Sequence, residues 1–297
     1  MKVYFKSKAE IDKMREANLV VCDVLDLLEE HCKPGVSTAE LNEIADRALK
    51  KAGSTSAFLG YASPPYPAVI CASIDHVVVH GIPRRDAILT DGCIVGLDFG
   101  VFKSGFCGDS ARTVMVGNVS AEARKLVEAT RQSLELAIAR CLPGNRIQDI
   151  GWAVQSFVEP LGYSVVRKFV GHGIGRAMHE EPDVPNRGRR GKGPMLVSGS
   201  VIFISAANSP NRLSVPMFVK SECGLFAMTF SAPELVDTLL NTPPAASITI
   251  CMTTSQPAAR TGWRAALPAH HLLASSTHAT SGERRWYSPG NSTRRRS

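Results

Sequence analysis

Apolar residues recur at helical spacing in two segments near the start of the chain. The first segment opens at Ser7, with Glu10 three residues later, and the second opens at Ser37, with Glu40 three residues later. A serine followed by a glutamate at this spacing is the capping-box pattern that begins a helix. Lys33-Pro34-Gly35 separates the two segments, so the sequence predicts two helices joined by a turn.

The same order of elements then recurs further along the chain. Strand-like runs occupy residues 68–71, 77–80, 94–116 and 162–166, and the helical period returns over residues 121–141 and 147–161. Asn145 is the predicted N-cap of the last helix. The order of two helices followed by strands thus occurs twice along the chain. This repetition predicts an α/β (α+β) domain of two similar halves, with its functional site at the seam between them.

The strand-like run over residues 94–116 is a hairpin that carries two aspartates. A tight turn at Lys103-Ser104 places Asp98 directly opposite Asp109, and side chains so paired project from the same face. Two carboxylates there repel each other unless a positive charge lies between them, which favours a divalent metal ion. A pair of surface aspartates is the alternative, and the apolar neighbours Leu97 and Phe99 argue against it.

The composition, with 44% apolar and 21% charged residues among 297, is typical of a soluble globular protein. We expect no membrane span, because no long apolar run occurs, and the chain start lacks the apolar core of a secretory signal. The eight cysteines include no C-x-x-C pair, which favours a reducing, cytoplasmic location.

The net charge of +7 is unevenly distributed. Residues 1–204 hold 25 basic and 23 acidic residues, a net +2, whereas residues 205–297 hold 9 and 4, a net +5. The tail ends in Arg294-Arg295-Arg296, which suggests a contact with RNA or the ribosome through this basic tail.

Three histidines stand in motifs that suggest a site. Gly171-His172-Gly173-Ile174-Gly175 is a glycine-rich turn that lets an imidazole project into a cavity, and its spacing does not fit a nucleotide-binding loop. His179 precedes Glu180-Glu181-Pro182 but lacks the second histidine of a zincin motif. His80 follows a valine run. Asp98, Asp109 and His172 together form an oxygen-plus-imidazole ligand set.

In combination, these motifs make residues 1–204 resemble a type I methionine aminopeptidase, a metallopeptidase of the pita-bread fold. The matching stretches, in chain order, are residues 33–38, 78–83, 94–109, 171–176 and 179–182. The resemblance implies a fold of two pseudo-symmetric halves around a central antiparallel sheet. It also implies an enzyme that hydrolyses the N-terminal methionine from nascent proteins, in the cytoplasm.

The resemblance further implies a site with two divalent metal ions (Co, Mn, Fe, Zn or Ni). In the family two aspartates, one histidine and two glutamates hold them, and Asp98, Asp109 and His172 match the first three. His80 and His179 match histidines that contact substrate and stabilise the reaction intermediate. The resemblance also implies that Cys71 and Tyr66 line the pocket for the methionine side chain, with Tyr61 as a further wall. Such soft, apolar side chains suit a thioether.

The pattern breaks after residue 204. A glutamate should follow residues 199–204, but the chain reads Ser205-Ala206-Ala207, and no later stretch matches the fifth ligand. We therefore predict a truncated catalytic domain over 1–204, with its second half incomplete, and a divergent, poorly ordered Ser/Thr/Ala/Pro-rich tail over 205–297. An out-of-frame or intronic origin of this tail is one hypothesis.

Two other functions stay open alongside an aminopeptidase of impaired activity and weak or partial metal binding. One is a non-catalytic pita-bread binding protein associated with RNA or the ribosome, which the missing glutamates favour. The other is a proline-cleaving peptidase of the same fold. Such enzymes usually carry a separate N-terminal domain, which this chain does not show before its first predicted helix.

Overall fold

The computed structural model describes residues 2–205, 207–210, 219–220, 229–230 and 248–249. All of them belong to one compact unit, Met1–Ala258. The predicted tail over residues 205–297, including Arg294-Arg295-Arg296, lies almost wholly outside the described residues, so its order and the completeness of the second half stay predictions.

The first two helices begin where the capping boxes predict. Helix α1 spans Lys8–His31 and α2 spans Thr38–Lys51. The Ser7 and Ser37 hydroxyls accept hydrogen bonds from the third residue of each helix, and the glutamates at those positions accept the serine backbone N–H at 2.9 and 2.8 Å. Each box satisfies N–H groups that a helix start otherwise leaves unpaired, which confirms both predicted starts.

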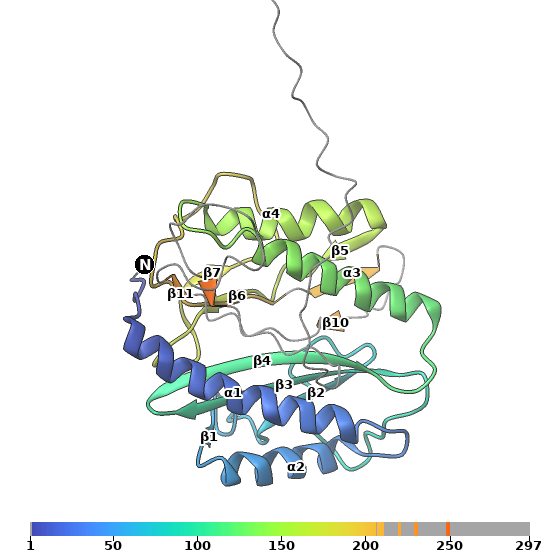
Figure 1. Ribbon diagram of the computed structural model, residues 1–297. Coiled ribbons are helices and arrows are strands. Elements are labelled where there is room, and N and C mark those ends of the chain that lie inside the picture. The colour runs from blue at the N-terminus through green and yellow to red at the C-terminus, as the bar shows by residue number, and fades with distance from the viewer. Residues whose placement is uncertain (1, 206, 211–218, 221–228, 231–247, 250–297) are drawn as a thin grey trace, which may run out of the picture. The chain divides into compact units, whose positions relative to one another are not determined.

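A four-stranded antiparallel sheet forms the centre of the first half. Its strands are β1 (Thr55–Ser56), β2 (Ile70–Ile74), β3 (Ile94–Lys103) and β4 (Phe106–Met115), and β3 pairs with all of the others. Helix α1 packs against β3 and β4, while α2 lies beside α1 (Figure 1). Apolar side chains from both helices and from the sheet fill one buried cluster between them.

The hairpin turn lies one residue later than predicted. Lys103 pairs with Phe106, so the turn is Ser104-Gly105, and both residues have positive φ, +53° and +79°. A two-residue turn of this kind matches the twist of the flanking strands, which explains why it forms here instead of at Lys103-Ser104.

This register places the two aspartates diagonally. Asp98 pairs with Ala111, and Asp109 pairs with Gly100, so the prediction that the aspartates directly face each other is wrong. Because the offset is two residues, the carboxylates still project from the same face of the hairpin.

The predicted strand over residues 77–80 is also wrong. After β2 the chain turns at Asp75, and both Asp75 and His80 have positive φ. The chain then returns beside β2, where the N–H of Ala72 donates to the Gly81 carbonyl at 2.8 Å. A Cβ at Gly81 would meet the Ala72 carbonyl oxygen at 2.2 Å, so the close return requires glycine. His80 therefore lies on a tight loop.

The described part of the second half contains two α-helices, a 3-10 turn and short strands. Helix α3 spans Ala121–Ile138, α4 spans Ile147–Val158, and the 3-10 turn η1 spans Glu159–Leu161. Short strands follow: β5 (Tyr163–Val165), β6 (Gly171–Gly173), β7 (Glu180–Val184), β8 (Ile202–Phe203), β9 (Ala207–Pro210), β10 (Val219–Lys220), β11 (Thr229–Phe230) and β12 (Ile248–Thr249). Arg146, not Asn145, is the N-cap of α4, because the Asp149 carboxylate accepts the Arg146 N–H.

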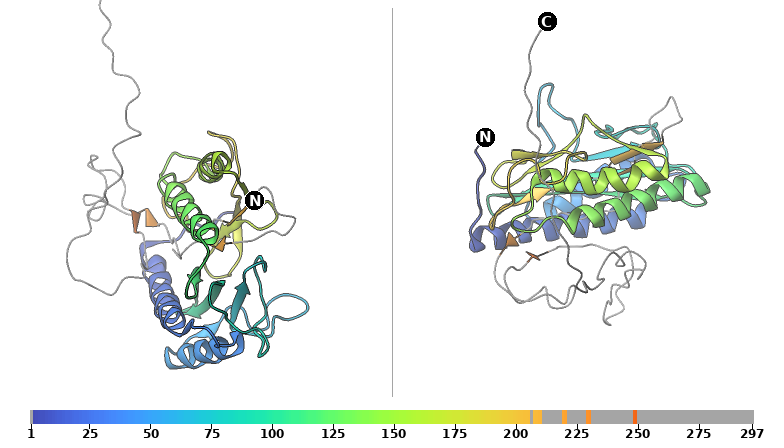
Figure 2. Two further views of the ribbon diagram at one scale, coloured as in Figure 1. Left: turned by 90° about the vertical axis from the view of Figure 1, so that its right-hand side faces the viewer. Right: turned by 90° about the horizontal axis from the view of Figure 1, so that it is seen from above.

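Strand β6 lies between β7 and β8 in an antiparallel sheet, and β9 pairs with β5 and β10. Helices α3 and α4 pack together on the side of the strands opposite α1 and α2 (Figures 1 and 2). Between the halves, a third apolar cluster joins Met14 of α1 and Phe106 of β4 to Ile174 and Met178 of the second half. The site-bearing strands thus meet at a seam, as predicted.

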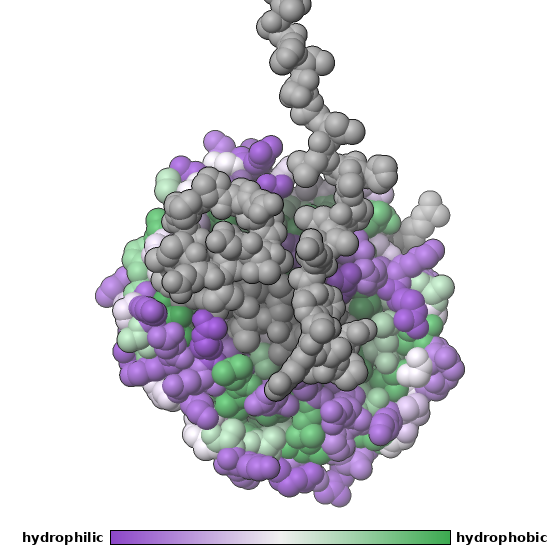
Figure 3. Space-filling model, in the orientation of Figure 1, coloured by the Kyte–Doolittle hydropathy of each residue, from purple (hydrophilic) through white to green (hydrophobic). Residues whose placement is uncertain are grey.

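Where Figure 3 is coloured by hydropathy, hydrophilic side chains alternate with apolar areas. Among the described residues, no helix combines the length and apolar character that crossing a bilayer requires.

Arg112 is the largest of the fully buried side chains, although it is charged. It lies on β4, 1% exposed, with its guanidinium 2.7 Å from Asp26 and 2.5 Å from Glu29 of α1. A buried cation is tolerated when carboxylates compensate it, so this triad fixes α1 on the hairpin that carries both aspartates.

Removing both carboxylates of this triad should destabilise the fold strongly. In the double variant Asp26→Asn/Glu29→Gln, the buried Arg112 loses these two carboxylates, and we expect a loss of about 3 kcal/mol in the free energy of unfolding, measured by urea denaturation. As the control, Asp46→Asn breaks the exposed Lys50–Asp46 pair and should cost at most about 0.5 kcal/mol. Equal losses in the two variants would contradict this account of the triad.

Candidate active site

A cavity of about 400 Å³ opens at the seam. Every residue predicted for the site lines it, namely Tyr61, Tyr66, Cys71, His80, Asp98, Asp109, His172 and His179. The first six come from the first half and the last two from the second. Their common location is a finding of the structure, and their individual roles stay predictions.

The two carboxylates are buried at the floor of this cavity. Asp98 is 7% exposed and Asp109 is 4% exposed, and both project from the β3–β4 hairpin. Two carboxylates buried on one face repel each other, so a bound cation would stabilise the pair.

His172 of β6 faces the same floor. Its Nε2 lies 3.9 Å from an Asp109 carboxylate oxygen, and its Nδ1 lies 2.9 Å from the Gly173 carbonyl oxygen. A carbonyl only accepts hydrogen bonds, so we assign the proton of the neutral ring to Nδ1. Nε2 then carries a lone pair toward the carboxylates, which is the form of histidine that binds metals.

Glycines place His172 where it lies. A Cβ at Gly171 would meet the Phe203 carbonyl oxygen at 2.2 Å, and one at Gly173 would meet the Glu181 carbonyl oxygen at 2.3 Å. Strand β6 can therefore approach both neighbouring strands only with glycine on either side of the histidine. The ring of Phe203 stacks on that of His172 with centroids 5.1 Å apart, which fixes the imidazole plane.

An ion pair fixes the turn between His172 and His179. Lys6 Nζ lies 2.5 Å from Glu180 Oε2, and both side chains are buried. The other carboxylate oxygen of Glu180 accepts the backbone N–H groups of Arg176 and Ala177 at 2.8 and 3.2 Å. Glu180 therefore has structural partners, consistent with its not being part of a zincin motif.

His179 lies beside His172, with ring centroids 4.1 Å apart. The Tyr61 hydroxyl is 2.8 Å from its Nδ1. Partial desolvation in the cavity lowers the pKa of His179 below its ordinary value, although part of the side chain is exposed, and His80 lowers this pKa further, while Asp98 and Asp183 act in the opposite direction. The neutral imidazole is thus favoured in the folded protein.

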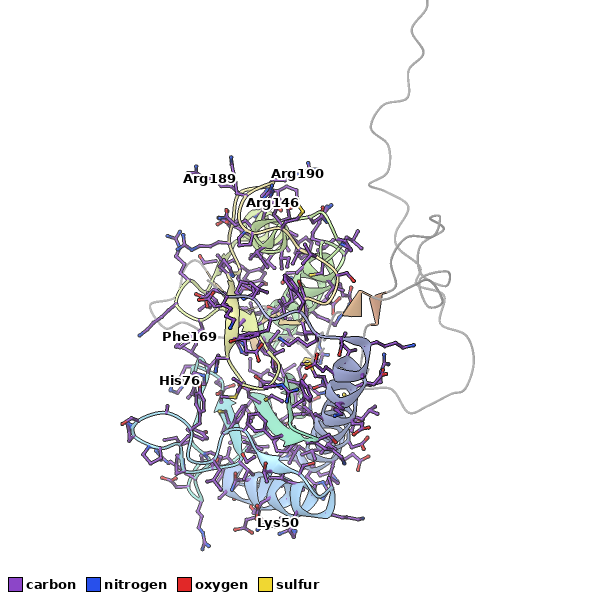
Figure 4. All side chains as sticks on the ribbon, turned by 90° about the vertical axis from the view of Figure 1, so that its left-hand side faces the viewer. Lys50, His76, Arg146, Phe169, Arg189 and Arg190 are labelled. Carbon is purple, nitrogen blue, oxygen red and sulfur yellow. The ribbon has the colours of Figure 1, made fainter. Side chains whose placement is uncertain are left out.

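The remaining walls are aromatic and soft. Tyr66 donates from its hydroxyl to the carbonyl oxygens of Ile70 and Gly81, at 3.0 and 2.9 Å, and burial raises its pKa. Cys71 is buried and pairs with Asp98 across β2 and β3. His80 meets the ring of Phe169 edge-on at 5.6 Å (Phe169 is labelled in Figure 4).

Sequence reasoning missed several lining residues, among them Phe58, Lys168, Phe169, Met178, Asp183 and Phe203. Asp183 is the cross-strand partner of His172 in β7, and this pairing becomes visible only in the folded sheet. Apolar residues such as Phe58 and Met178 gave no signal in the sequence, because their side chains are also those of an ordinary core.

Ser205 lines the cavity at the position where the resemblance places a glutamate ligand. Among the described residues, His, Cys, Asp and Glu side chains form no group of three gathered closely enough to hold a metal ion as they stand. The donors that do face one another, two carboxylates and one imidazole nitrogen, suit a divalent cation in kind. They are too few to surround two such ions.

Comparison with known proteins identifies the relatives of this arrangement. The model of metallopeptidase family M24 matches residues 12–225. The chain is 44% identical over 202 residues to a methionine aminopeptidase of Clostridium acetobutylicum, covering 68% of this chain and 80% of that protein. It is 49% identical over 201 residues to methionine aminopeptidase B of Synechocystis, covering 67% and 73%.

Solved structures agree with these sequence matches. Methionine aminopeptidase from Thermotoga maritima superposes with a TM-score of 0.69 at 33% identity, covering 75% of this chain and 92% of that one. The Xaa-Pro dipeptidase from Bacillus anthracis superposes with a TM-score of 0.62 at 20% identity, covering 74% of this chain and 59% of that one. This likeness concerns the fold alone. The higher sequence identity therefore makes the methionine aminopeptidases nearer relatives of this chain than the proline-cleaving peptidase.

The lowered pKa of His179 is directly measurable. In EDTA-treated protein, its NMR titration, assigned by loss of the signal in His179→Gln, should have a midpoint below 6.5, because burial disfavours the charged ring. Its contribution to stability is then complete above pH 6.5 and is lost as the pH falls through the folded-state midpoint. A midpoint at or above that of histidines in the urea-unfolded chain would contradict the assignment.

Proposed function

The chain belongs to metallopeptidase family M24, and from this premise we propose how its cavity removes the N-terminal methionine of nascent polypeptides. It is a metal-dependent aminopeptidase, a hydrolase, with the pita-bread fold that methionine aminopeptidases share with proline-cleaving peptidases. One observation carries the proposal for the site: carboxylates, imidazoles and a soft apolar wall all line one cavity of about 400 Å³.

The apolar wall suits a methionine side chain. Cys71, Tyr66 and Met178 line the cavity, and aromatic and sulfur-containing side chains make favourable contacts with a thioether. The hydroxyl of Tyr66 is engaged by two backbone carbonyls, so its ring presents an apolar face of fixed orientation. We assign substrate binding to these residues together with His80 and His179.

Asp98, Asp109 and His172 are the residues that would hold the divalent cation implied by the family. A cation bound there supplies Lewis-acid activation of a water molecule and of the scissile carbonyl group. The donors fit one ion, with water completing its coordination, and not the two ions that the resemblance implies, because Ser205 lacks a carboxylate. We therefore propose weak binding of a single Mn²⁺, Co²⁺, Fe²⁺, Zn²⁺ or Ni²⁺ ion.

His179 and His80 act on the peptide as hydrogen-bonding groups. With the Tyr61 hydroxyl donating to Nδ1, the neutral His179 ring carries its proton on Nε2. That N–H can donate to the carbonyl oxygen as negative charge develops on it, which lowers the barrier to hydrolysis. His80, held against Phe169, contacts the bound methionine.

Location and partners are proposed from the cysteines and from the charge distribution of the chain. We place the protein in the cytoplasm, where a nascent chain is available and thiols stay reduced. Cys32, Cys93, Cys107 and Cys141 are buried and in no disulfide, in keeping with that location. The predicted contact between the basic tail and RNA or the ribosome lies outside the described residues and stays a prediction. A non-catalytic binding protein on this fold is the competing function.

Hydrolysis of a Met-Ala-Ser peptide by the full-length protein tests the function. With added Mn²⁺ or Co²⁺ we expect methionine release that EDTA abolishes and that Asp98→Ala lowers about 10³-fold, because a metal-binding carboxylate is lost. The control Asp86→Ala removes an exposed carboxylate paired with Arg84 and should keep the wild-type rate. Wild-type release no faster than that of Asp98→Ala would favour the non-catalytic alternative.

A carboxylate at position 205 should strengthen metal binding. Isothermal titration of Ser205→Glu with Mn²⁺ should give at least about tenfold tighter binding than the wild type, because a fourth donor enters the cavity. The isosteric control Ser205→Gln adds volume without charge and should bind no more tightly than the wild type. Equal affinity for the Glu and Gln variants would contradict the view that a missing donor limits the site.

A further inference from the structure

Basic side chains gather on one face of the second half, away from the proposed active site. Residues 187–192, Arg-Gly-Arg-Arg-Gly-Lys, form a surface loop with four cations and no acid, which we term the basic loop. Figure 4 shows Arg189 and Arg190 beside Arg146 at the end of the molecule opposite Lys50. With Arg140, Arg146 and Arg167, the cations of this loop make up the basic face.

The basic loop is held in place by helix α4. The Gln148 side chain accepts the Arg189 N–H at 3.0 Å, and the Asp149 carboxylate accepts the Gly191 N–H at 2.6 Å. The second carboxylate oxygen of Asp149 accepts the N–H of Arg146 at 2.8 Å, so one buried aspartate joins the loop to the helix start. A ligand therefore meets a preorganised array of charges and loses little entropy by ordering it.

Two cavities flank the basic loop. The larger, about 850 Å³, is lined by Arg167, Arg187, Arg189 and Lys192. The smaller, about 270 Å³, is lined by three arginines, one acid and one aromatic ring, namely Arg140, Arg146, Arg190, Asp149 and Trp152. The cations thus line two hollows on either side of one rigid segment, which suits an extended anion better than a compact one.

Trp152 of α4 lies between two guanidinium groups. The Cζ atoms of Arg140 and Arg190 are 5.7 and 5.4 Å from its ring centroid. Such cation–π contacts hold the guanidinium planes while leaving their N–H groups available, and the half-buried indole adds an aromatic surface.

The cations of the basic face form no ion pair with any carboxylate that the structure describes. Arg131, on the exposed side of α3, differs in this respect, because Glu128 and Glu135 both neutralise it. Asp149 is the one carboxylate among the residues that line the two cavities, so the seven cations of the basic face keep an excess of positive charge, which attracts polyanions.

From these observations we propose that the basic face binds the phosphate backbone of RNA. Guanidinium forks match phosphate oxygens in bidentate geometry, and aromatic rings stack with unpaired bases. An acidic protein surface would also be attracted by the charge but would make no use of Trp152. Arg167 lines the larger cavity, whereas the next residue, Lys168, lines the cavity of the proposed active site.

Three triple variants of the full-length protein test the proposal. The first, Arg189→Gln/Arg190→Gln/Lys192→Gln, neutralises the basic loop. The second, Lys33→Gln/Lys50→Gln/Lys51→Gln, removes three exposed charges, one from the turn after α1 and two from the end of α2. The third, Arg294→Gln/Arg295→Gln/Arg296→Gln, removes three charges of the tail. Fluorescence anisotropy measures binding of a labelled single-stranded RNA of about 20 nucleotides over a range of KCl concentrations.

We expect the loop variant to bind RNA at least about tenfold more weakly than the wild type at ~0.1 M KCl, with a log–log salt slope shallower by about 2. Both other variants should bind within about twofold of the wild type. The loop variant should also keep the circular dichroism spectrum and the thermal midpoint of the wild type.

Three results would overturn the proposal. The first is wild-type affinity in the loop variant. The second is an equal loss in the lysine or the tail variant, which would assign binding to net charge or to the tail. The third is competition by polyglutamate as effective as that by unlabelled RNA of equal charge, which would assign the face to acidic proteins. Activity does not enter these readouts, so the proposal stands or fails separately from methionine release.

Discussion

The repulsion between two buried carboxylates on one hairpin is the constraint on which the site depends. Asp98 and Asp109 share a face because the Ser104-Gly105 turn offsets their pairing by an even number of residues. A one-residue slip would send one carboxylate to the opposite face. The Arg112 triad fixes α1 on the other side of the same strands, so the fold maintains an arrangement that is electrostatically unfavourable without a cation.

The second half completes this arrangement only in part. It supplies His172 with a lone pair aimed at the carboxylates, and His179 in a neutral form beside it. It also supplies Ser205, which has a single hydroxyl where a ligand carboxylate is implied. Among the described residues, the cavity therefore keeps the groups proposed to contact a methionyl peptide but only three proposed metal donors, so we expect the affinity for the metal to be lowered more than that for the peptide.

Local signals predicted the parts of the fold that local interactions determine. Both capping boxes set their helix starts, and the aspartate hairpin formed between the expected strands. The predictions failed where tertiary contacts decide: the valine run before His80 became a loop because Gly81 must approach β2. The basic loop was missed because averaging charge over residues 1–204 hides a local concentration of four cations. The prediction that the histidines and the carboxylates lie together rested on the resemblance of their motifs to a known family. Their positions along the chain do not by themselves specify which residues meet in the fold.

Anomalous diffraction from crystals of the full-length protein grown with Mn²⁺ would test the central claim most directly. The account predicts one anomalous peak in the cavity, at about 2.0–2.3 Å from oxygens of Asp98 and Asp109 and from Nε2 of His172. Two fully occupied peaks there, or a peak only at other residues, would contradict it. The first result would mean that residues beyond position 205 supply further ligands, and the second that the carboxylate pair does not hold the cation.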